Sequence, residues 1–274
     1  MISMLGIGLM AVFIILPLLV ASMFRIDAVK TVFAAFVKML LRVGVLGAAV
    51  YYLVAANSVW FDVAFGLAFV VYSIITVVVQ AKLSVRMYLL PVCAGMLVAL
   101  LVTGSLLLLL LNNSVDKGFG SHFLLPVIAL LAGSIVEPMS RSLSVYYMGL
   151  RHHNHLYYYL IGNGATRTEA LNYLMRRAIE KSLVPGMRQM SSLVVGCSPV
   201  VMWTMIMCGV EVLDAAFFQL LIVLAVFAAS VLSVFVAVWT ARRYVVDGYA
   251  RIKSEAVEID KVSEQNIVNN EQNI

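Results

Sequence analysis

The sequence YYYLIGNGATRTEALNYLMRRAIEKSLVP, residues 157–185, decides the fold of this chain, because it is the longest polar-rich segment in an otherwise apolar sequence. Asn163 and Gly164 supply the left-handed backbone positions that end one helix. Thr166 and Glu169 have the spacing of a capping box, which starts the next helix. The segment therefore predicts a helix, a tight turn and a second helix.

The second predicted helix has two chemically different sides. Apolar and small residues recur three and four positions apart, at Leu171, Leu174, Met175, Ala178 and Ser182. Polar residues occupy the other side, at Asn172, Arg176, Arg177, Glu180 and Lys181. This pattern predicts an amphipathic helix where the membrane meets the cytoplasm, ended by Pro185 because proline cannot donate an interior helical hydrogen bond. We expect this cytoplasmic segment, about residues 151–185, to be the docking surface for a soluble partner.

The composition of the rest of the chain indicates a polytopic membrane protein. Of its 274 residues, 63% are hydrophobic and 12% are charged, and the mean hydropathy is +1.00. Soluble domains have an apolar share nearer one half. The net charge of +5 does not indicate nucleic-acid binding, because the basic residues lie at the ends of apolar runs, where they act as topology signals and contact anionic lipid.

Apolar runs long enough to cross a bilayer as helices predict an all-α fold with about seven spans. The predicted spans cover residues 4–23, 33–55, 59–79, 89–111, 123–148, 186–208 and 214–240. Lys and Arg are concentrated in alternate connections, which places the N-terminus outside and the C-terminus in the cytoplasm. We expect one membrane domain over residues 1–253 and a disordered cytoplasmic tail over residues 254–274.

Glu137 and Arg141 are the most conspicuous charges inside a predicted span. They lie four residues apart on one helical face and can pair with each other. One hypothesis is that Glu137, with Ser134 and Ser140, lines a cation path beside a kink at Pro138. The other is that the two charges form a neutralised pair that holds helices together.

Two further clusters have the residue types of metal ligands. Span six is rich in sulfur, although methionine is also an ordinary gap-filling residue. His152 and His155 share a helical face next to His153, but two imidazoles without a positioned carboxylate make a poor zinc site. A metal site in the chain therefore stays unassigned.

The C-terminal half resembles the FetB-like permease family, the membrane subunits of iron-export ABC transporters, to which the plant aluminium-sensitivity transporters are related. The resemblance rests on these positions: Pro126, Ala132, Gly133, Ser134, Gly164, Ala165, Thr166, Ala170, Arg176, Ile179, Pro185, Pro199, Met202, Gly209, Glu211, Ala215 and Gln219. The chain departs from the family at Ser134, Tyr159 and Ser191, and it lacks both family glycines in residues 198–204. The chain thus resembles a divergent member of the FetB-like permease family.

The resemblance implies a homodimeric permease in the cytoplasmic membrane that exports a metal ion or small solute. This chain has no Walker A loop, so a separate ATP-binding subunit would bind and hydrolyse ATP. The residues that the resemblance implicates in coupling to that ATPase are Gly164, Ala165, Thr166, Glu169 and Arg176. Those expected along the translocation path are Ser134, Glu137, Arg141 and Gln219. We expect no enzyme activity and no cofactor in this chain itself.

Two other functions remain open from the sequence. An intramembrane enzyme could use the interfacial histidines, although no nucleophile and base pair is recognisable by spacing. A structural or regulatory membrane protein that has lost transport would account for the missing glycines. An ATPase partner distinguishes the permease from both.

Overall fold

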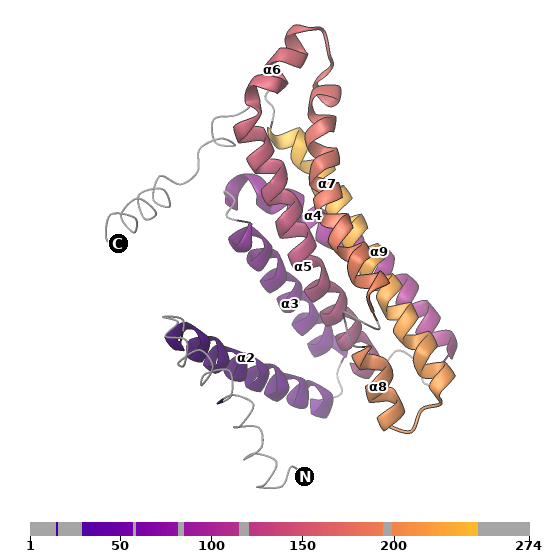
Figure 1. Ribbon diagram of the computed structural model, residues 1–274. Coiled ribbons are helices and arrows are strands. Elements are labelled where there is room, and N and C mark those ends of the chain that lie inside the picture. Colours follow the sequence, from indigo (N-terminus) through magenta and orange to yellow (C-terminus); the bar gives the residue numbers. More distant parts are fainter. Residues whose placement is uncertain are drawn as a thin grey trace. The chain divides into compact units, whose positions relative to one another are not determined.

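The computed structural model describes residues 15, 29–56, 59–81, 85–114, 121–193 and 199–245. Within these residues all regular secondary structure is helical (Figure 1). The helices are α2 Val29–Ala56, α3 Val59–Gln80, α4 Val85–Ser114, α5 Ser121–His152, α6 Asn154–Gly162, α7 Arg167–Ser191, α8 Val200–Met207 and α9 Val212–Val245. The predicted all-α class is confirmed for this part of the chain.

The chain divides into two compact units, residues 1–61 and residues 62–274. In the first unit, the apolar stretch Phe33–Leu53 of α2 has none of its side chains buried. A helix that is apolar on all sides is stable when it is surrounded by an apolar medium. This exposure is therefore expected of a helix that faces lipid.

The second unit is organised around the contact between α4 and α9. α5 packs on both of these helices and on α7, and α7 also packs on α9 (Figure 1). At Gly95 of α4, an added Cβ would lie 2.6 Å from the carbonyl oxygen of Ser233 and 2.9 Å from the Cβ of Ala237. Small residues of this kind allow the backbones of membrane helices to approach closely.

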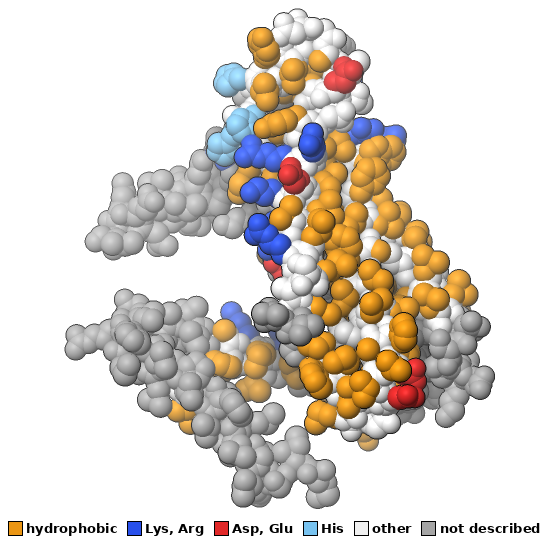
Figure 2. All heavy atoms as spheres, turned by 45° about the vertical axis from the view of Figure 1, so that its right-hand side comes forward, with side chains coloured by type: hydrophobic (Ala, Val, Ile, Leu, Met, Phe, Trp, Pro, Cys, Tyr) orange, Lys and Arg blue, Asp and Glu red, His pale blue; other side chains and the backbone are white. Residues whose placement is uncertain are grey.

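α6 and the first turns of α7 form a hairpin that projects beyond the other helices of this unit (Figure 1). Lys, Arg and His side chains gather on and just below this hairpin, whereas the opposite end of the unit is covered mainly by apolar side chains (Figure 2). The unit therefore has one polar end and a long apolar body, as a membrane-embedded bundle requires.

Four described helices are long and apolar enough to cross a membrane: Phe33–Leu53, Trp60–Gln80, Tyr88–Leu110 and Val212–Val245. They confirm a polytopic helical membrane protein but not the predicted count of seven. The predicted span at 4–23 lies outside the described residues, apart from residue 15. α5 spans 32 residues but carries Glu137, Arg141 and several serines in its second half, which lower its hydropathy.

The prediction of a sixth span running unbroken from 186 to 208 is wrong. α7 continues through Pro185 to Ser191, and the short α8 begins only at Val200. Packing holds α7 together across the proline: Ser182 bonds to α5 on one side, and Gly186 lies against Phe227 of α9 on the other. Tertiary contacts thus outweigh the local cost of the missing hydrogen bond.

Candidate functional site

The turn between α6 and α7 is set by backbone hydrogen bonds. Gly164 donates its N–H to the carbonyl of Ile161 and Ala165 donates to the carbonyl of Leu160, each at 3.0 Å, which is the pattern of a Schellman motif. Gly164 has φ +88°, a conformation that favours glycine. Asn163, which was predicted to share it, has φ −88°, so the left-handed position is Gly164 alone.

The predicted capping box is confirmed at the start of α7. The hydroxyl of Thr166 accepts a hydrogen bond from the backbone N–H of Glu169 (3.4 Å), and the Glu169 carboxylate accepts one from the backbone N–H of Thr166 (2.8 Å). The carboxylate also accepts a hydrogen bond from the Thr166 hydroxyl (2.8 Å). The bonds that it accepts from the backbone N–H and the hydroxyl of Thr166 lower the pKa of the Glu169 carboxyl group, since they favour its ionised form. Two adjacent motifs thus fix the direction in which α7 leaves the turn.

The buried side of α7 is the one that the sequence predicted, but it packs on protein. Ser182 donates from its hydroxyl to the carbonyl of Pro138 (3.0 Å), and Ser142 of α5 donates to the carbonyl of Ala178 (3.1 Å). An amphipathic pattern alone does not distinguish this packing from a position on the membrane surface. Arg176, on the opposite side, is exposed and lies about 15 Å along the helix from Thr166.

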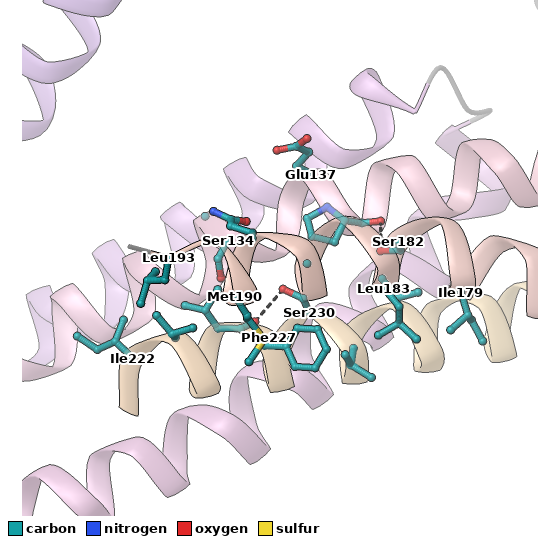
Figure 3. Close-up of a pocket in the computed structure, with 18 residues that line it drawn as sticks. Ser134, Glu137, Ile179, Ser182, Leu183, Met190, Leu193, Ile222, Phe227 and Ser230 are labelled. Atoms are coloured by element: carbon teal, nitrogen blue, oxygen red, sulfur yellow. Dashed lines mark hydrogen bonds between the residues drawn. The ribbon is translucent and has the colours of Figure 1, made fainter. Parts of the chain in front are cut away.

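A cavity of about 300 Å³ opens between α5, α7 and α9 (Figure 3). Its polar lining residues are Ser134, Glu137, Ser182, Gln189 and Ser230, and its apolar ones include Ile179, Leu183, Met190, Leu193, Ile222 and Phe227. A cavity of this size, with an apolar lining and a few polar groups, has the properties of a small-molecule site.

Two of the cavity's hydroxyl groups, those of Ser134 and Ser230, bond to their own helices. Ser134 donates to the carbonyl of Leu131 (2.9 Å), and Ser230 donates to the carbonyl of Val226 (2.8 Å). Each hydroxyl oxygen still has acceptor capacity. Pro138 has no N–H, so the carbonyl of Ser134 lacks its usual helical donor.

Glu137 and Arg141 form the predicted ion pair along α5. Glu137 lies at the rim of the cavity, and its carboxylate is directed away from the other labelled residues (Figure 3). Its side chain is 76% exposed and that of Arg141 is 42% exposed. The pair is therefore on the outer face of α5, and Arg141 does not line the cavity.

Gln219 does not line the cavity either. Its side chain is buried, and its amide oxygen accepts a hydrogen bond from the backbone N–H of Met202 at 3.1 Å. Met202 lies in the first turn of α8, where backbone N–H groups have no partner within the helix. Because Pro199 at the start of α8 provides no side-chain cap, Gln219 of α9 caps this helix from outside.

The histidine cluster is exposed at the end of α5. His152 bonds through its Nδ1 to the carbonyl of Met148 (2.9 Å), and the helix is interrupted at His153. The sequence predicted that His152 and His155 share the face of one helix. That prediction is wrong, because His152 ends α5 and His155 belongs to α6. Among the described residues, no three His, Cys, Asp or Glu side chains come together as a metal site.

The structure thus brings Gly164, Ala165, Thr166 and Glu169 together in one turn and places Ser134 and Glu137 at one cavity. Sequence reasoning missed the contributions of α7 and α9 to that cavity, among them Gly186, Gln189, Phe227 and Ser230. The serines of α5 could have indicated that another helix packs against it, since hydroxyls in an apolar helix often bond to a neighbouring helix.

The model of a family described as "Uncharacterised protein family (UPF0014)" matches residues 4–246. No curated protein and no solved structure matches the chain. The matched region contains both the hairpin and the cavity.

Proposed function

The chain belongs to the uncharacterised protein family UPF0014, which is of the ABC-transporter permease type, and we propose that it is the membrane-spanning permease subunit of an ABC transporter. In this proposal it exports a metal ion or small solute across the cytoplasmic membrane as a homodimer. A separate ATP-binding subunit supplies the energy. The family match over residues 4–246 is the observation that carries the proposal.

The α6–α7 hairpin supports a role in coupling. A coupling element has to transmit the closure of an ATPase to the membrane helices as a rigid-body movement. The Schellman motif and the capping box make this turn rigid, and the two hydrogen bonds between α5 and α7 tie it to the cavity wall. We assign Gly164, Ala165, Thr166, Glu169 and Arg176 to the ATPase contact.

The cavity supports a role in translocation. Ser134 and Glu137 belong to its lining, and α7 joins it directly to the hairpin. A change in the position of the hairpin would therefore move one wall of the cavity. Arg141 contributes by neutralising Glu137, and Gln219 contributes by positioning α8 against α9.

The test is co-purification of an ATPase from gently solubilised membranes. The tagged wild-type chain is compared with Gly164→Pro, which disrupts the turn, and with Arg176→Glu, which reverses one exposed charge. Arg243→Glu is the control, because it reverses an exposed charge at the end of α9. Bound protein is identified by its sequence and by ATP hydrolysis.

We expect an ATPase with a Walker A motif to co-purify with the wild type and the control, and to be lost from both hairpin variants at equal expression. Retention of the ATPase by both hairpin variants would exclude the hairpin as its contact. Absence of any ATPase from the wild type would refute the permease proposal.

A further inference from the structure

One edge of α7 carries three exposed cationic side chains, Arg177, Lys181 and Arg188. They are four and seven residues apart, so they follow one another along the same face of the helix. In the described part of the chain, none of the three has a carboxylate within ion-pair distance. This edge is therefore a row of uncompensated positive charge.

The position of this row relative to α5 follows from the register of the two antiparallel helices. The hydrogen bonds from Ser182 to Pro138 and from Ser142 to Ala178 pair these residues across the contact. The antiparallel pair has an approximate two-fold axis perpendicular to the plane of the helices. On each helix, the residue immediately before a contact residue therefore lies on the same side of the helix pair.

The residues that precede these four contact residues are all charged. They are Glu137 and Arg141 on α5 and Arg177 and Lys181 on α7. Since Glu137 is paired with Arg141, the side as a whole keeps the positive charge of α7. Figure 2 shows Lys and Arg side chains gathered along one edge of the molecule below the histidines.

Arg188 extends the row away from the hairpin. It is 11 residues beyond Arg177, or roughly 16 Å along the helix, which is about half of the ~30 Å hydrocarbon thickness. Wherever such a row enters a bilayer, its charged side chains face protein or a wet cavity, because exposure to lipid is costly. The α7 residues Ile179, Leu183 and Gly186 line the cavity between α5, α7 and α9 and lie on the opposite face of the helix, so the row runs along the outer face of α7.

We propose that this cationic edge binds a small anion bearing carboxylate or phosphate groups, and that such an anion is the transported substrate. The proposal rests on the proposed permease function and specifies its substrate class. A two-fold dimer formed through this side would bring two identical cationic rows together. Their mutual repulsion would be relieved by an anion held between them, to which Arg can donate two parallel hydrogen bonds.

The test uses the full chain in nanodiscs of neutral phosphatidylcholine, without any ATPase. The thermal midpoint is titrated with citrate and with pyrophosphate at constant ionic strength. The variants are Arg188→Gln, the double variant Lys181→Gln, Arg188→Gln, and Arg188→Lys, which keeps the charge. Arg176→Gln is the matched control, because it removes a cation from the other edge of α7.

We expect a saturable rise in the midpoint with at least one anion, and at least a tenfold weaker apparent affinity in Arg188→Gln and in the double variant. Arg188→Lys and the control should retain most of the effect. If the double variant does not fold, the affinity of Arg188→Gln alone tests the proposal. No saturable response, or an equal loss in Arg176→Gln, would overturn the proposal.

A second arm distinguishes a soluble anion from a lipid headgroup, by replacing part of the phosphatidylcholine with phosphatidylglycerol. Stabilisation by this lipid alone, lost in Arg188→Gln, would make the edge a lipid site and overturn the substrate assignment. ATPase co-purification is independent of both arms. If an ATPase co-purifies but no anion binds, the permease function stands and the anion proposal is refuted. If an anion binds but no ATPase co-purifies, the anion site stands and its assignment to a transported substrate is refuted.

Discussion

Replacing Gly95 by alanine should destabilise the protein, because α9 approaches α4 closely at Gly95. The added Cβ would be 2.6 Å from the carbonyl oxygen of Ser233, 2.9 Å from the Cβ of Ala237 and 3.0 Å from the Cε of Met139. The methionine can move away, but the carbonyl belongs to the backbone of α9. The two helices must therefore separate locally.

The expected cost follows from two opposing effects. Overpacking a well-packed contact costs about 1–3 kcal/mol, whereas exchanging glycine for alanine inside a helix gains roughly 0.5–1 kcal/mol. The net destabilisation is then on the order of 1–2 kcal/mol, since the rigid carbonyl places this site at the upper end of the range. For a chain of this size each kcal/mol lowers the thermal midpoint by about 2–4 °C.

The assay is thermal unfolding of the purified protein in detergent, followed by tryptophan fluorescence at one scan rate. Gly104→Ala is the matched control on the same helix, because its Cβ would meet Leu131 at an ordinary 3.7 Å. We expect Gly95→Ala to unfold a few degrees below the wild type and Gly104→Ala to match or exceed it. An unchanged midpoint in Gly95→Ala would refute the close approach of α4 and α9.

Three other outcomes follow from the geometry. Gln219→Leu removes the cap of α8 and should cost about 0.5–2 kcal/mol, so hydrogen exchange in α8 should accelerate while that in α7 stays unchanged. Gly164→Ala places a side chain at φ +88°, which costs roughly 1–2 kcal/mol and should increase proteolysis at the hairpin. Because the folded-state pKa of Glu169 is lowered, the ionised carboxylate stabilises the folded protein in full above the ordinary carboxyl pKa of about 4.3. That contribution is lost as the pH falls through the lower folded value; Glu169→Gln should remove this dependence, and equal pH profiles for both proteins would contradict it.

The hairpin could be predicted from the sequence because its determinants are local. Glycine at a left-handed position and the spacing of Thr166 and Glu169 act within a few residues, so they specify the same turn in any surroundings. The two sides of α7 were predicted for the same reason, since helical periodicity assigns each residue to a face. Which other helices or which medium cover each face of α7 depends on residues far apart in the chain, so it could not be predicted from local sequence.

The end of α7 was predicted wrongly because Pro185 is a local signal that tertiary contacts overrule. The bond from Ser182 to α5 and the packing of Gly186 on Phe227 hold the helix across the proline. The assignment of Gln219 illustrates the same limit. A buried amide in an apolar helix predicts a hydrogen bond, but only the fold shows that its partner is the backbone N–H of Met202.

The membrane class, the helical class, the hairpin turn and the pairing of Glu137 with Arg141 could all be predicted from the sequence, since each depends on composition or on residues within about one helical turn. The side chains that form the cavity could not, and neither could the position of the charges of α5 and α7 on one side. Those features depend on the register between helices, and that register is set by hydrogen bonds and packing between residues far apart in the chain.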